Sequence, residues 1–337
     1  MRRRVAILFN VDEGLARGVA VDALAARGVR AAARAVEAAC RERGHEAFLV
    51  PAPIEPQALL ERLAGLHPDV VFNLVEALSG EARLEAAVAS LLELARWPYT
   101  GSPPLALAIG LDKALTRDLL HGRGVAVPAG RLLRRGDEPL DDLRFPCIVK
   151  PVREDASHGI DAESVVQDVA AARERARAVS ERYAEPALVE EFVAGREFNV
   201  SILGGGETAR VLPLAEIDFT GLPSGHPHLV TYAAKWIETS VEYRGTPSIA
   251  ARPLAPALGA RLELAALAAY RAVGGRDYGR VDMRLHPEAG PVVLEVNPNP
   301  DLSPDAGLAR AAARGGIAYA DLVAGIVAAA LARSRPS

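Results

Sequence analysis

The sequence has few of the residues that would tie a protein to an oxidising compartment or to nucleic acid. Its 337 residues include only two cysteines, Cys40 and Cys147, in a predicted helix and a predicted strand. A reduced, cytoplasmic protein is the simplest interpretation. The net charge of −4 is small and no basic stripe stands out, so no nucleic-acid partner is expected. The composition is otherwise that of a globular protein long enough for two or three domains.

Long hydrophobic runs are also absent. The basic segment Arg2–Arg4 is followed by the apolar run Val5–Phe9, which is far too short for a signal peptide or a membrane span and predicts a buried strand. The alanine-rich stretch Ile317–Ala332 is shorter than a span and contains Asp321, so it predicts a helix packed on the core. We therefore expect no membrane partner.

Two common site signatures are missing as well. The seven histidines form no HExxH-type pair, and His226-Pro-His228 is more typical of a loop than of a metal clip. The run Gly204–Glu207 lacks the following helix and the Gly-Lys-Ser/Thr of a P-loop, so a hairpin turn is the better interpretation.

The N-terminal part alternates predicted strands and helices. Strands are expected at 4–10, 47–50 and 69–74, and helices at about 29–43, 55–66 and 82–95. This order predicts an α/β unit whose parallel sheet is covered by helices. Ligands bind such sheets at the carboxyl ends of the strands, where Glu13 and Glu76 are expected. An ordinary loop or capping role is the alternative for both residues.

The rest of the chain predicts two α+β units. The strand Phe145–Pro151 ends in Lys150, and the polar loop 153–159 after it suits closure over a phosphate held by that lysine. The long stretch 217–253 is typical of a functional lid and contains Lys235. The three expected domains cover residues 1–115, 116–198 and 199–337.

The most informative pattern is a predicted hairpin. Tyr278–Leu285 and Pro291–Asn297 each alternate apolar and polar residues, and the break between them has hairpin chemistry. If the loop closes symmetrically about residues 288–289, polar side chains face each other on one side of the hairpin. The pairs are then Asp282 with Glu295 and Arg280 with Asn297.

These four side chains suggest a metal and anion site. Opposed carboxylates repel each other in a sheet, and a bound divalent cation turns that repulsion into attraction. Asp282, Glu295 and Asn297 offer hard oxygen ligands suited to Mg²⁺ carried with nucleotide phosphates. Arg280 beside them could stabilise anionic charge during a reaction. The alternative is a solvated hairpin face whose acids alternate by chance.

Taken in chain order, the short segments described above resemble those of the ATP-grasp carboxylate–amine ligases. Within that superfamily they are most similar to D-alanine–D-alanine ligase. The resemblance covers nearly the whole length and implies the ATP-grasp fold with an N-terminal parallel-sheet domain. The matching segments are Pro98–Ser102, Asp112-Lys113, Val149–Pro151 with Arg153-Glu154, Val189–Val193 with Gly195–Phe198, Lys235, and Gly279–Asp282 with Leu294–Pro298.

The resemblance implies roles for individual residues. The residues implied to bind ATP are Lys113, Lys150, Glu190, Glu191, Val193, Glu197 and Lys235. Those implied to bind two Mg²⁺ ions, or Mn²⁺, are Asp282, Glu295 and Asn297. Arg280 matches an arginine that stabilises the tetrahedral intermediate, and Ser157 belongs to the matching phosphate-covering loop; with Lys235 they are the implied catalytic residues. A homodimer is also implied.

The substrate side departs from the pattern of D-alanine–D-alanine ligase. Where that family has His-Gly-x-x-Gly-Glu-Asp-Gly, this chain has Asn73–Gly80, and Trp236 stands where a tyrosine is expected. Because a site built to hydrogen-bond particular groups discriminates strongly, we expect a different substrate. The candidate substrate residues are Glu13, Glu76, Trp236, Asp301 and Ser303.

The preferred hypothesis is an ATP-dependent ligase that joins a small carboxylate to a small amine, both expected to be amino acids, through an acyl phosphate. Three alternatives stay open. One is D-alanine–D-alanine ligase of cell-wall synthesis with a drifted pocket. Another is a nucleotide-binding regulator without catalysis. The last is a protein that binds no ATP and whose hairpin acids are ordinary surface.

Overall fold

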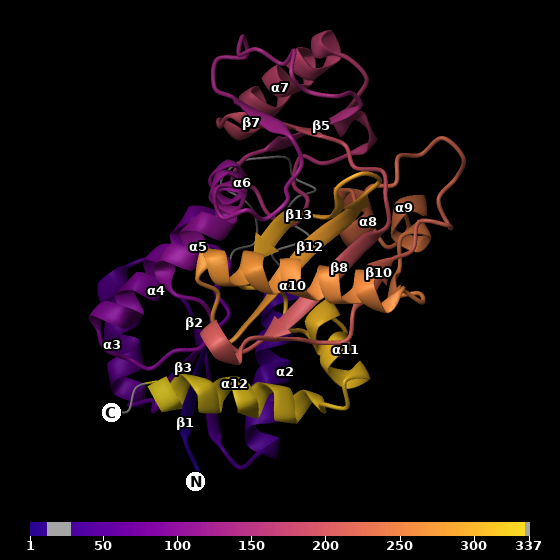
Figure 1. Cartoon of the computed structure of the whole chain (residues 1–337). Coiled ribbons are helices and arrows are strands. Elements are labelled where there is room, and N and C mark those ends of the chain that lie inside the picture. The colour runs from indigo at the N-terminus through magenta and orange to yellow at the C-terminus, as the bar shows by residue number, and fades with distance from the viewer. Residues whose placement is uncertain (12–27, 334–337) are drawn as a thin grey trace.

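The computed structural model describes residues 1–11 and 28–333. The described strands form three sheets, which the chain builds one after another (Figure 1). The predicted combination of α/β and α+β units is confirmed. The domain boundaries near residues 115 and 198 stay a prediction.

The N-terminal sheet is parallel, as predicted, with strand order β2-β1-β3. Its elements are β1 (Arg4–Phe9), α2 (Gly28–Glu42), β2 (Glu46–Pro51), α3 (Pro56–Leu66), β3 (Val70–Asn73), a 3-10 turn (Ala82–Leu84) and α4 (Glu85–Leu94). Val5 and Ile7 pack with α2, whereas Ala6 and Leu8 pack with α3 and α4. Both faces are covered, which is why these strands are apolar apart from Arg4, Glu46 and Asn73 at their ends.

The central sheet is antiparallel, with strand order β4-β7-β5-β6. Before this sheet the chain forms α5 (Pro104–Leu111) and α6 (Lys113–Gly122), whose Ile109 and Leu120 pack with the buried cluster of the third sheet. The central unit then contains β4 (Gly130–Leu133), β5 (Cys147–Pro151), a 3-10 turn (Ala162–Ser164), β6 (Val165–Val166), α7 (Val169–Tyr183) and β7 (Ala187–Glu191). Apolar residues of α7, among them Ala172 and Val179, pack on Val149 and Val189 of the sheet. The ends of β5 and β7 therefore place Lys150 and Glu190.

The third sheet carries the hairpin and has strand order β11-β10-β8-β12-β13, with β9 beside β8. Its strands are β8 (Glu197–Leu203), β9 (Arg210–Val211), β10 (Ala215–Ile217), β11 (Ser248–Ala250), β12 (Tyr278–His286) and β13 (Gly290–Asn297). Helix α10 (Pro256–Val273) lies across one face (Figure 1), where Leu262 and Ala266 pack with Val281 and Val296. Because successive side chains point to opposite faces, the polar hairpin residues lie on the other face.

The hairpin pairs as predicted but turns differently. The predicted pairs, Asp282 with Glu295 and Arg280 with Asn297, are both present. His286 pairs with Gly290, however, so the assumption that the loop closes about residues 288–289 is wrong by half a residue step. A β-bulge after Asp282 leaves Leu294 as an extra residue on β13 and restores the predicted pairing.

The stretch 217–253 is less irregular than predicted. It contains α8 (Tyr232–Trp236), α9 (Val241–Gly245) and β11. The Oγ atoms of Thr231 and Ser240 cap the two helices by accepting backbone N–H bonds of 3.1 and 2.9 Å. Helices of five residues are too short to show a helical period, which explains why the sequence pattern missed them.

The last two helices, α11 (Gly307–Arg314) and α12 (Tyr319–Arg333), return the chain to the N-terminal sheet. Helix α12 lies near α2 (Figure 1), and Val323 and Ile326 join the same buried cluster as Val5, which confirms the predicted packing of this segment. Among the described helices, none alone is long and apolar enough to cross a membrane, and only α11 and α12 together, bent by 105°, pass such a test.

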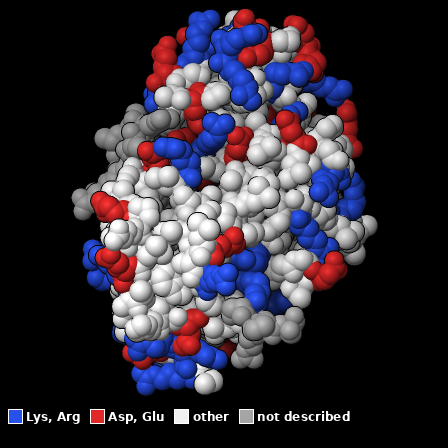
Figure 2. Space-filling view, turned by 90° about the vertical axis from the view of Figure 1, so that its left-hand side faces the viewer, with Lys and Arg blue, Asp and Glu red and all other residues white. Residues whose placement is uncertain are grey.

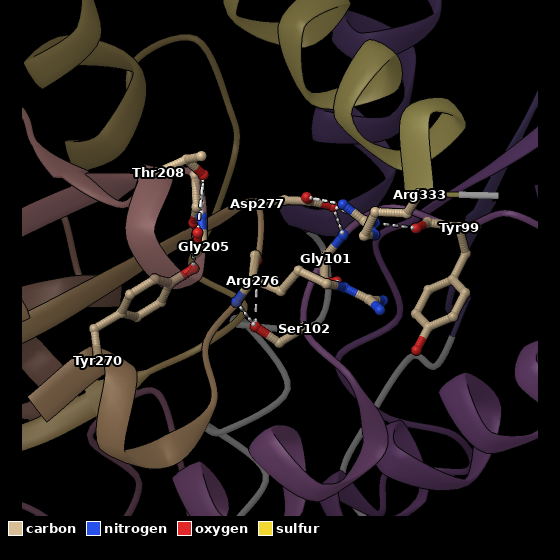
Figure 3. Close-up of polar contacts among 10 residues, drawn as sticks. Tyr99, Gly101, Ser102, Gly205, Thr208, Tyr270, Arg276, Asp277 and Arg333 are labelled. Atoms are coloured by element: carbon tan, nitrogen blue, oxygen red, sulfur yellow. Dashed lines mark hydrogen bonds and ion pairs between the residues drawn. The ribbon is translucent and has the colours of Figure 1, made fainter. Parts of the chain in front are cut away.

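A buried polar cluster fixes the start of β12 (Figure 3). Asp277 accepts hydrogen bonds of 2.9 Å from the backbone N–H of Gly101 and of 2.9 Å from Nη2 of Arg333. The backbone N–H of Arg276 donates to Oγ of Ser102 at 3.1 Å. Asp277 has a φ of 65°, which is uncommon for a residue with a side chain. These bonds therefore hold β12 against both the N-terminal region and α12.

The face on the side of α3, α4 and α5 has few charges in its middle. Figure 2 shows charged side chains gathered mainly towards the two ends of the molecule in this view. Leu94 and Leu105 are 82% and 70% exposed. The described residues of this face therefore form no continuous patch of one charge sign that would steer a charged partner.

Candidate active site

Two cavities meet on the free face of the hairpin sheet. The first, of about 300 Å³, lies between the central sheet and the hairpin sheet. The second, of about 460 Å³, lies between the carboxyl ends of the N-terminal strands and the hairpin. The residues that line both cavities are Lys235, Ser248, Arg280, Glu295 and Gly307. The hairpin therefore faces a junction at which two bound molecules can touch.

Arg280 and Asp282 form a two-bond ion pair on this junction. Nε of Arg280 lies 2.7 Å from Oδ1 of Asp282, and Nη2 lies 2.9 Å from Oδ2. Nδ2 of Asn199 donates to the same Oδ1 at 2.8 Å. The two side chains are only 20% and 13% exposed, so the alternative of a solvated hairpin face is wrong. Burial alone would lower the pKa of Arg280, but Asp282 and Glu295 raise it.

Glu295 is surrounded by cations. Burial alone would raise the pKa of its carboxyl, but the neighbouring positive charges hold the pKa below its ordinary value. The cations, in order of effect, are Lys113, Lys235, Arg280 and Lys150. Glu295 is therefore ionised at neutral pH, and the cations around it leave room for further anionic charge.

The predicted lysines reach the junction from different elements. Lys113 is the first residue of α6, and Asp112 caps that helix by accepting a 2.9 Å bond from the N–H of Leu115. Its Nζ donates to the carbonyl oxygen of Glu154 and lies 3.7 Å from Oδ1 of Asp155. Lys235 comes from α8, where burial and then the charge of Arg280 lower its pKa. The first residue of α6 and the fourth residue of α8 thus bring two cations to the same junction, near Glu295.

Lys150 and Glu190 form a buried ion pair in the wall of the first cavity. Nζ of Lys150 lies 2.5 Å from Oε2 of Glu190, and the two side chains are 9% and 3% exposed. Glu191 and Val193 also line this cavity, as predicted for a nucleotide site. The structure thus brings every residue of the predicted ATP-binding set to the first cavity, and their roles in binding ATP stay predictions.

Glu197 is held by a residue that the sequence analysis missed. Arg284 donates to Oε2 of Glu197 from Nε at 2.8 Å and from Nη2 at 2.6 Å, and its Nη1 donates to the carbonyl oxygen of Val193 at 2.6 Å. Arg284 is fully buried and lines the first cavity. Its spacing from Arg280 and Asp282 on one strand face was the signal that could have found it.

The loop after β5 is tied across the junction. Oγ of Ser157 donates to the carbonyl oxygen of Val230 at 3.1 Å, and Nε1 of Trp236 donates to the carbonyl oxygen of Ala156 at 3.0 Å. Ala156 and Ser157 have φ angles of 55° and 62°. Ser157 lines the first cavity and Ala156 the second, so this loop forms part of both walls.

The predicted substrate residues do not all reach the second cavity. Glu76, Trp236 and Asp301 line it. Ser303 lines neither cavity, and its Oγ donates to Oδ1 of Asp301 at 2.7 Å. Glu13 lies outside the described residues. For Ser303, a role in direct contact with substrate therefore has no support from its position.

Two further polar residues line the second cavity and were missed from sequence. Asn299 donates from Nδ2 to Oε1 of Glu85 at 2.7 Å and to the carbonyl oxygen of Val75 at 3.2 Å. Its Oδ1 accepts a 3.0 Å bond from the hydroxyl of Tyr278. Burial raises the pKa of Glu85 well above its ordinary value. Within the predicted helix 82–95 nothing in the sequence distinguishes Glu85, because only the fold turns the start of α4 towards the hairpin.

The predicted metal ligands are Asp282, Glu295 and Asn297. Among the described residues, no group of three or more His, Cys, Asp or Glu side chains is placed to hold a metal ion. The predicted set has a different composition, two carboxylates and an amide. Oδ1 of Asn297 accepts a 2.9 Å bond from the N–H of Asn299, and this bond orients the amide. Oxygen donors paired across a hairpin fit a hard cation.

Comparisons with known proteins agree with this geometry. The sequence model of the family described as "D-ala D-ala ligase C-terminus" matches residues 133–328. A protein of Sinorhizobium fredii named "Uncharacterized protein y4sG" is 37% identical over 88% of this chain and 86% of its own length. D-alanine–D-alanine ligase of Bordetella avium is 31% identical over 89% of this chain and 89% of its own length.

The fold has a matching solved structure. D-alanine–D-alanine ligase from Bacillus anthracis, complexed with ATP, superposes with a TM-score of 0.75 at 23% identity and covers 98% of both chains. Fold, family match and relatives define the class of this protein: it is an ATP-grasp ligase that forms C–N bonds. Within that class, the chain belongs to the D-alanine–D-alanine ligase family.

Proposed function

We propose that this ligase uses ATP to activate a small carboxylate as an acyl phosphate and joins it to an amine, forming a peptide or amide bond between substrates other than two D-alanines. The observation that carries the proposal is the junction of the two cavities at Lys235, Arg280 and Glu295. A nucleotide in the first cavity and a carboxylate in the second would place the transferring phosphoryl group between these side chains.

The residues of the first cavity suit ATP. The wall on the side of the central sheet carries the Lys150–Glu190 pair and the backbone of residues 191–193, which can present polar groups to a base and a ribose. Lys113 and Lys235 lie towards the hairpin, where they would neutralise phosphate charge. ATP is present in the structure of the Bacillus anthracis relative, and this supports the assignment.

Asp282, Glu295 and Asn297 would hold Mg²⁺, since all three offer oxygen and Glu295 is ionised. Bound there, the ion would neutralise phosphate charge and orient the phosphates. Arg280 has the separate task of binding the anionic oxygens of the reacting centre, because its raised pKa keeps it charged. Asp282 orients Arg280 through the two-bond ion pair.

The reaction balances with the groups at hand. A carboxylate oxygen of the acid attacks the γ-phosphorus, and the bond from that phosphorus to the bridging oxygen breaks as ADP leaves. The neutral amine nitrogen then attacks the carbonyl carbon, the bond from that carbon to the phosphate oxygen breaks, and the nitrogen loses a proton to water or to the leaving phosphate. Phosphoryl transfer requires positioning and charge neutralisation more than covalent help, which is what three lysines and an arginine provide.

The altered second cavity supports a substrate other than two D-alanines. Trp236 bonds to the loop backbone, and Glu76, Glu85 and Asp301 give this cavity an acidic wall. D-alanine–D-alanine ligase activity is the alternative, which the names of several relatives favour. The alternative of a nucleotide-binding regulator without catalysis has no observation in its favour, and membership of a ligase family speaks against it. The homodimer and the two-ion metal site stay predictions.

The test is release of ADP and phosphate from ATP with a panel of amino acids, with product identified by mass. We expect turnover with panel members and little with D-alanine alone. Efficient D-alanyl-D-alanine formation would contradict the proposed substrate, and no nucleotide turnover with any pair would contradict the activity.

Glu295→Gln tests the metal assignment. Removing one ionised ligand should raise the Mg²⁺ concentration needed for half-maximal activity by about tenfold or more, because ligand charge sets affinity. The measurement is a Mg²⁺ titration of the ADP release rate, with the far-ultraviolet spectrum as a folding check. An unchanged Mg²⁺ requirement would remove Glu295 from the site.

A further inference from the structure

Among the residues that the structure describes, the second cavity is lined by more carboxyl groups than cationic side chains. Its carboxylates are Glu76, Glu85, Glu154, Asp155, Glu295 and Asp301, its cations are Lys235 and Arg280, and its one histidine is His158. Loss of hydration and mutual repulsion favour the protonated form of such carboxyls, as the raised pKa values of Glu76 and Glu85 indicate, and positive charge on a ligand would favour the ionised form.

Three of these carboxylates already have cationic or histidine neighbours. Asp155 lies 3.7 Å from Nζ of Lys113, and Glu154 lies 3.4 Å from Nδ1 of His158. Glu295 is surrounded by the cations of the junction. The remaining three, Glu76, Glu85 and Asp301, form no ion pair with any residue that the structure describes.

Glu85 is the strongest single indication of a ligand. It is only 8% exposed, yet it lines the cavity. Asn299 donates to its Oε1, whereas its Oε2 accepts no hydrogen bond from residues 1–11 or 28–333. Oε2 of Glu85 is not one of the fully buried side-chain atoms that lack a partner, so it stays within reach of water or of a donor on a ligand bound in the cavity.

Glu76 and Asp301 extend this wall from two other segments. The backbone N–H of Glu76 donates to Oδ1 of Asn10 at 3.1 Å, which fixes Glu76 at the carboxyl end of the N-terminal sheet. Asp301 is held by Ser303, whose N–H and Oγ both donate to its Oδ1 at 2.7 Å. Loss of water in the cavity wall, then the charges of Asp301 and Asp155, raise the pKa of Glu76 to about 8, although its side chain remains accessible from the cavity.

We propose that the second cavity selects a basic amino acid, whose two ammonium groups are held by the acidic wall of Glu76, Glu85 and Asp301. The carboxylate of that amino acid would point to Arg280 and Lys235 at the junction. A neutral amino acid brings one ammonium group to three carboxylates, whereas a basic one brings two. This inference rests on the proposed ligase function and adds the class of substrate.

The binding test uses pairs of equal chain length in both enantiomers, ornithine against norvaline and lysine against norleucine, titrated calorimetrically into the full-length protein. The basic member should bind about tenfold more tightly or better. Glu85→Gln and Glu76→Gln should each cut that preference to about threefold or less. The control Glu288→Gln, on a side chain 76% exposed at the hairpin turn, should leave it unchanged.

A proton count separates a binding role from a merely structural one. An ammonium group binds ionised Glu76, so binding near neutral pH should release protons, measured by titration in buffers of different ionisation enthalpy. Affinity for ornithine should rise as the pH rises towards 8, where Glu76 loses its proton. Glu76→Gln should reduce both effects. The charged groups facing Glu76 are Asp301, Asp155 and Glu85, and those elsewhere in the cavity wall are Glu154, His158, Lys235, Arg280 and Glu295.

The outcomes distinguish this inference from the proposed function. Equal binding of basic and neutral partners, no binding of any basic amino acid, or a preference that survives both glutamine variants would overturn the inference. If basic amino acids bind selectively but no pair of substrates drives ADP release, the inference stands and the ligase proposal fails. If neutral amino acids drive ADP release as well as basic ones do, the ligase proposal stands and the inference fails.

Discussion

The two cavities of this protein differ in how fully their walls pair charge. In the first, Lys150 is paired with Glu190, and Glu197 with Arg284. In the second, Glu76 and Asp301 form no ion pair among the described residues. A wall whose charges already pair can hold its shape before a ligand arrives, whereas an unpaired wall depends on the ligand for compensation. The first is where this chain keeps its family's pattern, and the second is where it departs.

The largest expected effect comes from breaking a pair in the first cavity. Lys150→Met leaves Glu190 charged and buried, and loss of one partner of such a pair costs about 3–5 kcal/mol of the free energy of unfolding. Urea unfolding followed by circular dichroism measures this. The double variant Lys150→Met/Glu190→Gln should recover most of the stability but not ATP binding. If Lys150→Met is as stable as the parent, the ion pair between Lys150 and Glu190 does not contribute to stability as proposed.

Next in size is the junction itself. Arg280→Ala should lower kcat by about 10²–10³-fold, the range for removing one group that stabilises developing negative charge. The apparent affinity for ATP should change much less, because other cations remain around the phosphates. Arg280→Lys keeps the charge but loses the two-bond geometry with Asp282, so its kcat should lie between that of the parent and that of Arg280→Ala. If Arg280→Ala keeps the parent kcat, the residue does not act on the reacting atoms.

A smaller effect is expected at the wall of the second cavity. Trp236→Phe removes the Nε1–H bond to the carbonyl oxygen of Ala156 and keeps an aromatic ring. One hydrogen bond is worth about 1 kcal/mol, so KM for the amino-acid substrate should rise about fivefold while KM for ATP stays the same. Steady-state kinetics with each substrate varied in turn decides this. If only KM for ATP changes, Trp236 acts on the first cavity and not on the second.

The smallest effect is expected outside both cavities. Arg144 and Glu288 form a 3.4 Å ion pair on side chains that are 73% and 76% exposed. Arg144→Ala should change the free energy of unfolding by less than about 1 kcal/mol, because water and salt screen such pairs. Thermal unfolding at low and high salt is the measurement. A loss comparable to that of Lys150→Met would mean that burial does not separate the two kinds of pair.

The sequence pattern predicted much of the first cavity and little of the second. Alternation on the hairpin predicted the pairing of Asp282 with Glu295, even though it placed the turn wrongly and could not anticipate the bulge at Leu294. The second cavity is built from the ends of β1 and β3, the start of α4 and the segment after β13. Glu85 and Asn299 are 214 residues apart in the chain, and no local pattern connects them.

From the sequence alone came the order of strands and helices, the alternating face of the hairpin and the family to which it points, because those depend on periodicity and short motifs along the chain. Only the tertiary structure decided that the two cavities share Lys235, Arg280 and Glu295, and that three acids from distant segments line one wall. The physical reason is that burial, pKa and ion pairing depend on neighbours in space, and packing brings those neighbours together only once the sheets and helices have assembled.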